Sequence, residues 1–373
     1  MIYLEKNVFD EALDRIRFLY DTHDDVIVGM SGGKDSTVLF NMTMIVARER
    51  GRLPLKVFWL DQEAEWQETV NYMDYIMRLP DVKPYWFQVP MDFPNCLSNR
   101  NCRLLVWDPQ KKDEWIHPQS DIAITKNPMG DRLDFTFYDL IGNLKNYCTD
   151  GNCAVLTGMR IAESPMRRFA ITSGKPVFHG ITWGNKKGKD DKYQVFYPIY
   201  DFSFSDIWTA IGRNHWKYNT VYDKQYQSGV ASTKMRVSAL IHETAWYAMD
   251  SLQEFEPQTY NKFVKRISGS SAITHAFDYN EVLPKQLPFM FKDWKEYRDY
   301  LLVNIVNPEY HDFFRKRWRN QDGEDWYKVH VKECILNDLD GTLNKTRRTM
   351  LSKRNPDLKK ELEEYLNDKR PAD

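Results

Sequence analysis

The sequence lacks any apolar run of the roughly 18 residues that a membrane-spanning helix requires. Its opening stretch, MIYLEKNVFDEALDRI, carries acidic residues where a secretory signal peptide needs an uninterrupted apolar segment. Cysteine is scarce, with five in 373 residues, and an odd number does not suit a secreted disulfide framework. These absences predict a cytoplasmic protein with reduced thiols and no membrane association.

A metal-ligand pattern is also missing. The eight histidines show no His-x-x-x-His or similar cluster, which argues against a catalytic transition metal. Four cysteines form two pairs, but their spacings are looser than is usual for structural zinc and no motif surrounds them. These four are Cys96, Cys102, Cys148 and Cys153. We therefore predict neither a zinc site nor an iron–sulfur cluster.

The chain has no excess of charge of either sign. Lys and Arg number 52 against 53 Asp and Glu, so the formal net charge is -1 and any basic surface has to be local. Residues 313–321 and 344–355 interleave basic with aromatic or hydroxyl side chains. A face for nucleic acid and a solvated or protein-binding helix surface both fit this pattern.

Alternating strand and helix patterns occupy the first 90 residues. Apolar residues at spacings of three and four predict an amphipathic helix before residue 22. The strand-like runs are DVIVGMS (25–31), LKVFWLD (55–61) and KPYWFQVP (83–90), and the helical runs between them cover residues 36–51 and 68–79. This order predicts an α/β fold, a Rossmann-like parallel sheet with helices on both faces.

The pattern changes twice further along the chain. Residues 91–149 are punctuated by Pro, Asn and Asp and contain one helical stretch, so we interpret them as an insertion or active-site cover. A fourth strand is predicted at 153–160, a hairpin at 179–202 and a helix with Ser205 as its N-cap. Beyond residue 250 helical stretches predominate. We predict a nucleotide-binding α/β domain over 1–250 and a helical domain over 251–373.

The stretch SGGKDST, residues 31–37, lies between a predicted strand and a predicted helix. Unpaired backbone N–H groups and the positive end of the helix dipole favour an anion there. The stretch is not a Walker A loop, because Asp35 follows Gly33-Lys34 and Val28 stands where the first glycine belongs. The Gly-x-Gly-x-x-Gly spacing of dinucleotide-binding loops is absent too.

The residues form a Ser-Gly-Gly-x-Asp-Ser motif, which resembles the PP-loop of the adenine-nucleotide alpha hydrolases; they are Ser31, Gly32, Gly33, Lys34, Asp35 and Ser36. The resemblance implies a HUP-type fold and a loop that grips the pyrophosphate of ATP while an acceptor attacks the α-phosphorus. Glycines allow close approach, and Ser31, Ser36 and Thr37 supply hydroxyl donors. Lys34 offsets charge, and Asp35 suits the site if it helps to hold Mg²⁺ or caps the turn.

A second block, LTGMRIAESPMRR (156–168), follows the fourth strand. Its arginines can contact phosphate or sulfate at the strand end, where open α/β sheets bind ligands. Its Gly-x-Arg-x-x-Glu-Ser pattern resembles the phosphoadenosine phosphosulfate reductase branch of the PP-loop group. We predict catalytic roles for Lys34, Asp35, Arg160 and Arg167. The expected nucleotide-binding residues of this block are Gly158, Glu163, Ser164 and Arg168.

Two further segments bear on the site. Asp61 ends the second strand, where an acid contacts a ribose or metal in some sheets and merely starts a helix in others. The stretch YPIYDFSFSDIW (197–208) resembles the Pro-Ile-x-Asp-Trp segment of the same branch, with Phe202 in place of Trp. We expect Asp201, Asp206 and Trp208 to support the site and begin a helix.

The chain departs from sulfonucleotide reductases at their C-terminal Glu-Cys-Gly-x-His segment. Cys334 follows Glu333, but the glycine and histidine are missing, and apolar neighbours favour a packed thiol over a nucleophile. The resemblance also implies that an intact loop accompanies ATP cleavage, whereas the reductases carry a degenerate one. ATP, with Mg²⁺, is therefore the favoured substrate.

The leading hypothesis is a PP-loop transferase that cleaves ATP between the α- and β-phosphates and adenylylates a small acceptor, sulfate being one candidate. One alternative is an enzyme that binds or reduces adenylyl sulfate or its 3′-phosphorylated form. Across its length the chain also resembles phage- or plasmid-associated members of the branch related to immunoglobulin-binding regulator A proteins. That resemblance implies a second alternative, a nucleotide-dependent regulator acting with a ParB-like partner.

Overall fold

The computed structural model describes most of the first 336 residues. The described residues are 6–95, 103–135, 137–144, 151–163, 167–168, 171, 180–186, 193–232, 235–242, 249–267, 270, 284, 286–336 and 338. The chain divides into two compact units, which are interleaved along the sequence. The first comprises Met1–Phe93, Leu105–Leu240 and Tyr247–Arg266, and the second comprises Pro94–Leu104, Ile241–Trp246 and Ile267–Asp373. The functional division at residue 250 stays a prediction.

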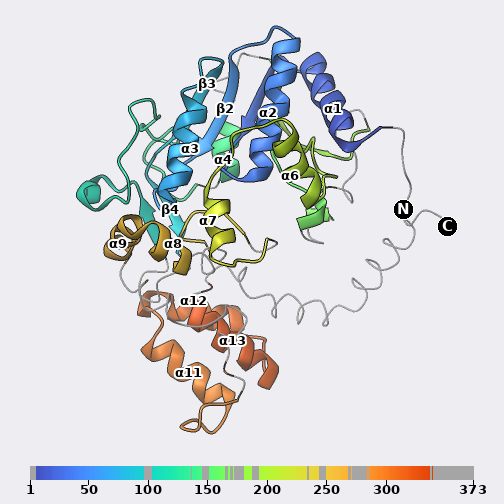
Figure 1. Cartoon of the computed structure of the whole chain (residues 1–373). Coiled ribbons are helices and arrows are strands. Elements are labelled where there is room, and N and C mark those ends of the chain that lie inside the picture. The colour runs from blue at the N-terminus through green and yellow to red at the C-terminus, as the bar shows by residue number, and fades with distance from the viewer. Residues whose placement is uncertain are drawn as a thin grey trace, which may run out of the picture. The chain divides into compact units, whose positions relative to one another are not determined.

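A six-stranded sheet forms the centre of the first unit, in the order β3-β2-β1-β6-β8-β7 (Figure 1). The first five strands of this order are parallel, and only β7 runs antiparallel, paired to β8. The strands are β1 Asp25–Gly29, β2 Leu55–Leu60, β3 Val82–Phe87, β6 Cys153–Leu156, β7 Gly184–Lys186 and β8 Tyr193–Phe196. The predicted parallel α/β sheet and the hairpin are confirmed.

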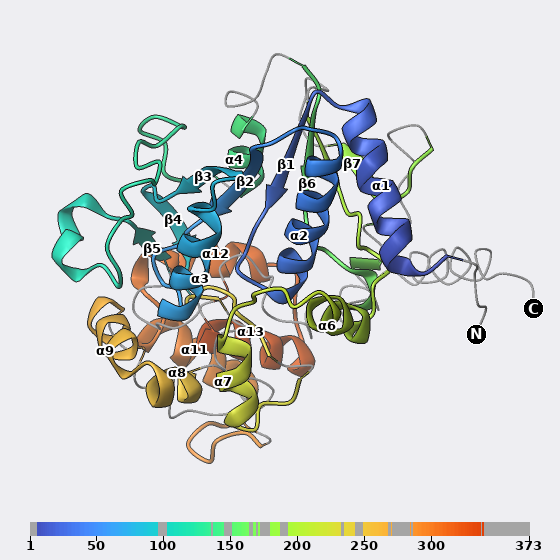
Figure 2. The same ribbon diagram turned by 45° about the horizontal axis from the view of Figure 1, so that its top comes forward.

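Helices cover both faces of this sheet, as the sequence predicted (Figure 2). Four of them share one apolar core with the strands; they are α1 Val8–Thr22, α2 Lys34–Glu49, α3 Gln67–Met77 and α6 Phe204–Arg213. On the other face, α4 Phe137–Asn143 approaches β8 so closely that a Cβ on Gly142 would lie 3.2 Å from the Tyr193 hydroxyl. Near-continuous burial of β1 and β6 follows from this double cover.

The start of α6 differs from its prediction. Ser203, rather than Ser205, is the N-cap, because its backbone is extended and its hydroxyl accepts a hydrogen bond from the Asp206 N–H. The Asp206 carboxylate accepts from the Ser203 N–H in return, which completes a capping box. Ser205 lies inside the first turn, where its hydroxyl is 2.8 Å from that of Ser203.

The predicted insertion contains structure that the sequence did not reveal. Two short strands, β4 Met91–Pro94 and β5 Arg103–Val106, pair in a separate sheet, and a 3₁₀ helix, η1, covers Pro109–Glu114. The insertion is joined to the end of β2 by buried polar contacts. The Trp107 N–H donates to Glu63 over 2.6 Å, and the Trp107 indole donates to the Asp61 carbonyl over 2.8 Å.

After α7, which covers Val221–Gln227, two helices complete the first unit. They are α8 Met249–Phe255 and α9 Pro257–Arg266. Between them, Glu256 accepts hydrogen bonds from the Gln67 and Glu68 N–H groups and so caps α3. Arg266 forms a buried ion pair with Glu63, with Nε 2.7 Å from the carboxylate. Residues 249–266 are therefore part of the first unit.

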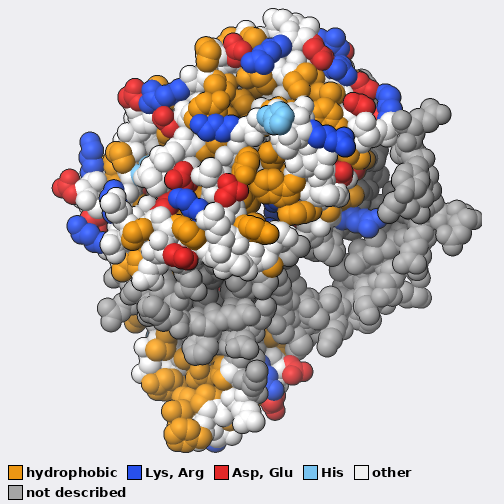
Figure 3. Space-filling view, viewed as in Figure 1, with side chains coloured by type: hydrophobic (Ala, Val, Ile, Leu, Met, Phe, Trp, Pro, Cys, Tyr) orange, Lys and Arg blue, Asp and Glu red, His pale blue; other side chains and the backbone are white. Residues whose placement is uncertain are grey.

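Residues 294–336 of the second unit form helices. These are α11 Trp294–Asn304, η6 Pro308–Tyr310, α12 His311–Trp318 and α13 Glu324–Leu336. Their shared core includes Trp294, Phe314, Val331 and Cys334. Apolar side chains are exposed over α11 (Figure 3), among them Val303 at 57%. In the described part of both units, no helix is long and apolar enough to cross a membrane.

Replacing Arg266 by leucine tests the buried ion pair. The change leaves Glu63, which is fully buried, without its cation, so we expect the free energy of unfolding to fall by about 3–5 kcal/mol in urea titrations of the full chain. Arg48→Leu is the matched control, because its pair with Asp81 is largely exposed and should contribute less than about 1 kcal/mol. Equal losses in the two variants would contradict this account.

Candidate functional site

The glycine loop connects the end of β1 to the start of α2, at the carboxyl edge of the sheet. Gly32 has a φ of +69°, and a Cβ there would lie only 2.7 Å from Cγ2 of Thr69 on α3. Gly33 is the N-cap of α2 and has no side chain with which to cap it. Gly32 is therefore required by the backbone path, whereas Gly33 has an ordinary extended backbone and a Cβ there would lie 3.2 Å from the Ser31 hydroxyl oxygen. Together they bring backbone N–H groups to the helix start.

The loop hydroxyls support the turn. Ser36 and Thr37 are buried and both donate to the Gly33 carbonyl over 2.9 Å, and the Thr37 hydroxyl is also 2.9 Å from that of Tyr72. Ser31 is exposed, and its hydroxyl accepts a long hydrogen bond of 3.4 Å from the Gly33 N–H. Of the three predicted hydroxyl donors, Ser31 is the one at the surface of the loop.

Two residues that the sequence analysis did not select hold the loop from outside. Asn219 donates to the Gly32 carbonyl over 3.1 Å and to the Thr69 hydroxyl over 2.8 Å. The hydroxyl of Tyr222, on α7, accepts a 3.1 Å hydrogen bond from the Lys34 N–H, the first amide of α2. Trp208 packs edge-on against Tyr222, as its expected supporting role requires. The contacts with Gly32 and Lys34 join residues 187 and 188 positions apart, so no local sequence pattern indicates them.

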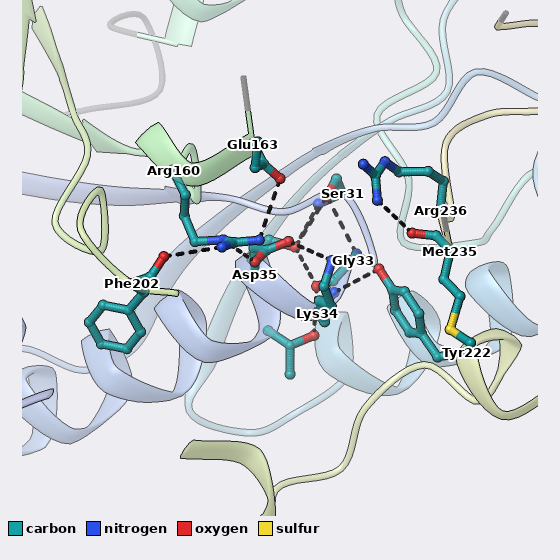
Figure 4. A network of polar contacts seen from close by, with 12 residues as sticks. Ser31, Gly33, Lys34, Asp35, Arg160, Glu163, Phe202, Tyr222, Met235 and Arg236 are labelled. Carbon is teal, nitrogen blue, oxygen red and sulfur yellow. Dashed lines mark hydrogen bonds and ion pairs between the residues drawn. The ribbon is translucent and has the colours of Figure 1, made fainter. Parts of the chain in front are cut away.

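Lys34, Asp35 and Arg160 form a line of alternating charge at the start of α2 (Figure 4). Asp35 lies between the two cations, with one carboxylate oxygen 3.1 Å from Lys34 Nζ and the other 2.6 Å from Arg160 Nε. A further Arg160 nitrogen donates to the Phe202 carbonyl over 3.1 Å. The structure thus brings together three of the four residues predicted to be catalytic.

Lys34 is buried, with 4% of its side chain exposed. Burial lowers the pKa of Lys34, Asp35 acts against that shift, and the positive charges of Arg160 and Arg236 add to the lowering. Its ammonium also faces the rings of Tyr222 at 5.4 Å and Phe204 at 6.0 Å. A polyanion beside Lys34 would favour its charged form.

The second block lies against the loop mainly through Gly158. A Cβ on Gly158 would approach the Asp35 carbonyl carbon and the Ser36 nitrogen to 3.0 Å, so this glycine permits close packing of the β6 end on α2. Glu163 is 3.8 Å from Arg160 and also pairs with Arg167. Arg167 and Arg168 are exposed, and Ser164 lies outside the described residues.

Asp61 occupies a different environment from the one expected of a ribose ligand. Its carboxylate is fully buried and accepts hydrogen bonds from the Trp86 indole at 3.0 Å and the Gln88 amide at 2.8 Å. His117 Nε2 is 3.3 Å away. Burial opposes protonation, but the charge of Asp61 and hydrogen bonds to Asp61 and the Pro118 carbonyl together outweigh it and raise the pKa of His117. Asp61 thus organises the interior beneath the insertion, and its contact with a nucleotide stays a prediction.

The residues do not fit a magnesium ion held by the protein. Both carboxylate oxygens of Asp35 already accept from cations, which would repel a divalent metal. Among the described residues, no group of three or more His, Cys, Asp or Glu side chains is arranged to bind a metal. Of the four paired cysteines only Cys153 is described, and it is buried in β6.

Residues 25–93, from β1 through the glycine loop and into β4, match the phosphoadenosine phosphosulfate reductase domain family. The resemblance predicted from the loop motif is therefore confirmed for this part of the chain. Over a longer range, the chain is 28% identical across 331 residues to the uncharacterized protein YbdN of Escherichia coli strain K12. That alignment covers 85% of this chain and 79% of YbdN.

Solved structures with a partial likeness include two fungal proteins. One is phosphoadenylyl-sulfate reductase from Candida auris in a phosphate complex, with 15% identity, a TM-score of 0.33, and 60% of this chain and 93% of the other covered. The other is Candida glabrata FMN adenylyltransferase with FAD and pyrophosphate, with 10% identity, a TM-score of 0.36, and 60% and 63% covered. The chain thus spans less than two thirds of the adenylyltransferase, and neither score supports an argument about activity.

Replacing Gly158 by alanine tests the close packing of the second block on the loop. The added Cβ would press on backbone atoms of α2, so we expect the free energy of unfolding to fall by about 1–3 kcal/mol, measured by chemical denaturation. Gly212→Ala provides the control: it lies in α6 with nothing within 4 Å of an added Cβ and should stabilise by about 0.5–1 kcal/mol. A neutral Gly158→Ala variant would refute the packing role.

Proposed function

We propose that this chain binds ATP at residues 31–37 and transfers the adenylyl group to a small acceptor, with release of pyrophosphate. The observation that carries the proposal is the strand–loop–helix arrangement at β1 and α2, in which an intact Ser-Gly-Gly-Lys-Asp-Ser motif places a buried lysine beside the helix start. Such a helix start favours a polyphosphate through its N–H groups and its dipole.

In the proposed reaction an acceptor oxygen attacks the α-phosphorus. The new bond forms as the bond from the α-phosphorus to the bridging oxygen breaks, and the bridging electron pair leaves with pyrophosphate. Charge therefore grows on the leaving group, where Lys34 and the N–H groups of the loop would stabilise it. An oxyanion such as sulfate or a carboxylate is already deprotonated, so such an acceptor requires no general base.

Asp35 gives the site its order before any ligand binds. Because it accepts from both Lys34 and Arg160, it holds two flexible cations in fixed positions, and fixed charges stabilise a transition state without reorganisation. Arg167 and Arg168 are exposed near Glu163 and are proposed to contact the outer phosphates or the acceptor. No step is assigned to Mg²⁺, since the residues around Asp35 do not fit it.

A sulfonucleotide remains the second candidate, supported by the match of residues 25–93 to the reductase domain family. The thiol chemistry of the reductases is not supported by Cys334. Its side chain is fully buried within α13, and burial raises the pKa of the thiol well above its usual range, so the reactive thiolate is disfavoured. A ParB-like partner stays a prediction from resemblance.

Lys34→Gln is the direct test of the ATP proposal. Removing the lysine charge should weaken ATP binding by at least about tenfold in calorimetry, because charge-assisted bonds contribute about 1.5–3 kcal/mol. Pyrophosphate release from α-labelled ATP, in the presence of sulfate or other acceptors, should fall further. Lys83→Gln, on the exposed side of β3, should behave as the wild type. Unchanged binding and turnover in Lys34→Gln would exclude the proposed site.

Cys334→Ala separates the two candidate reactions. If the chain adenylylates an acceptor, this variant should retain full turnover once its stability has been checked by thermal melting, because a thiol buried in α13 takes no part. If the chain instead reduces a sulfonucleotide through a thiosulfonate, turnover with adenylyl sulfate should disappear in the variant while nucleotide binding persists. That second result would replace the ATP proposal.

A further inference from the structure

The segment 235–237 lies directly over the glycine loop and is held there by α7. Gln225 makes two hydrogen bonds to the backbone of Arg236, donating to its carbonyl over 2.6 Å and accepting from its N–H over 3.0 Å. Next to it, Val237 faces the loop, since a Cβ on Gly33 would lie 3.5 Å from Val237 Cγ2 and 3.4 Å from the Tyr222 hydroxyl. The backbone on either side of the Arg236 side chain is thereby fixed relative to the loop.

The Arg236 guanidinium is half-buried and has no carboxylate partner among the described residues. The guanidinium donates a 2.8 Å hydrogen bond to the Met235 carbonyl, which uses one of its five donors. In Figure 4 the guanidinium extends from the Met235 segment toward the Ser31 side of the loop, whereas Arg160 approaches Asp35 from the opposite side. Arg160 is neutralised by Asp35, and Arg236 is not.

The positive charge of Arg236 affects the pKa of two groups at the loop, Lys34 and Tyr222. Burial is the main cause of the lowered pKa of Lys34, and the positive charge of Arg236 contributes to the same shift. Burial likewise raises the pKa of Tyr222, and Arg236 acts against that rise. Arg236 is a half-buried cation close enough to Lys34 to affect its pKa, and no carboxylate among the described residues neutralises it. Such a cation raises the free energy of the empty site. An anion placed between the loop and Arg236 would relieve that repulsion.

We propose that Arg236 is a phosphate-binding residue of this site, and that it selects a ligand with a polyphosphate chain over a nucleoside monophosphate. The inference rests on the proposed binding of ATP at the loop. Asp35 pairs with Lys34 and Arg160 but not with Arg236, so Lys34 and Arg236 are two cations at the loop that no shared carboxylate links. A chain of phosphates along the loop can engage both.

The test compares Arg236→Gln with the wild type in calorimetric titrations of the full chain with ATP, ADP, AMP and adenosine. We expect ATP affinity to fall about 10- to 100-fold, ADP affinity to fall less, and AMP and adenosine affinities to change less than about twofold. Arg236→Lys should recover part of the ATP affinity, because it restores the charge without the planar fork. Arg213→Gln, at the exposed end of α6, should match the wild type.

Two results would overturn the inference while leaving the proposed function intact. One is ATP binding by Arg236→Gln with wild-type affinity. The other is an equal loss for ATP, AMP and adenosine, which would assign Arg236 a structural role in holding the segment over the loop. A wild-type chain that binds none of the four ligands would overturn the proposed function itself, and the inference with it.

Discussion

One carboxylate, that of Asp35, orders the charges on which the candidate site depends. It lies in the first turn of α2, where the helix dipole favours an acid, and it accepts from Lys34 on one side and Arg160 on the other. Lys34 comes from the loop after β1 and Arg160 from the loop after β6, which are neighbouring strands. Because these two strands are neighbours in a parallel sheet, their ends bring the two cations close together, and Asp35 fixes their positions.

This arrangement explains why the site tolerates a buried lysine. An ammonium removed from water is costly unless a charge or an aromatic face compensates it, and Lys34 has both in Asp35 and the rings of Tyr222 and Phe204. The same contacts hold the lysine side chain in its buried position. A site of this kind is preorganised for an anion that arrives with several charges, because each cation is already placed when the ligand enters.

The elements that could be predicted are those determined by residues close together in the sequence. Apolar runs specify β1, β2 and β3, and the glycine pair specifies the turn before α2, so the sheet and the loop were predictable. What escaped prediction depends on contacts between distant segments. Asn219 and Tyr222 contact the loop although they lie far from it in sequence, and Asp61 is contacted by Trp107 and His117 of an insertion whose strands carry no clear pattern. The predicted N-cap of α6, Ser205, lies two residues after the actual one, Ser203, because either serine can precede a helix as its cap.

The contacts of Glu256 and Arg266 mean that the first unit is not encoded by a continuous stretch of sequence. The first caps α3, and the second neutralises a carboxylate at the end of β2, although both residues follow the last strand of the sheet by some distance. During synthesis all strands of the sheet would therefore leave the ribosome before Glu256 and Arg266 do. A fragment that ends at residue 250 would leave the start of α3 without Glu256 and buried Glu63 without its cation, so the first unit depends on residues 251–266 for these contacts.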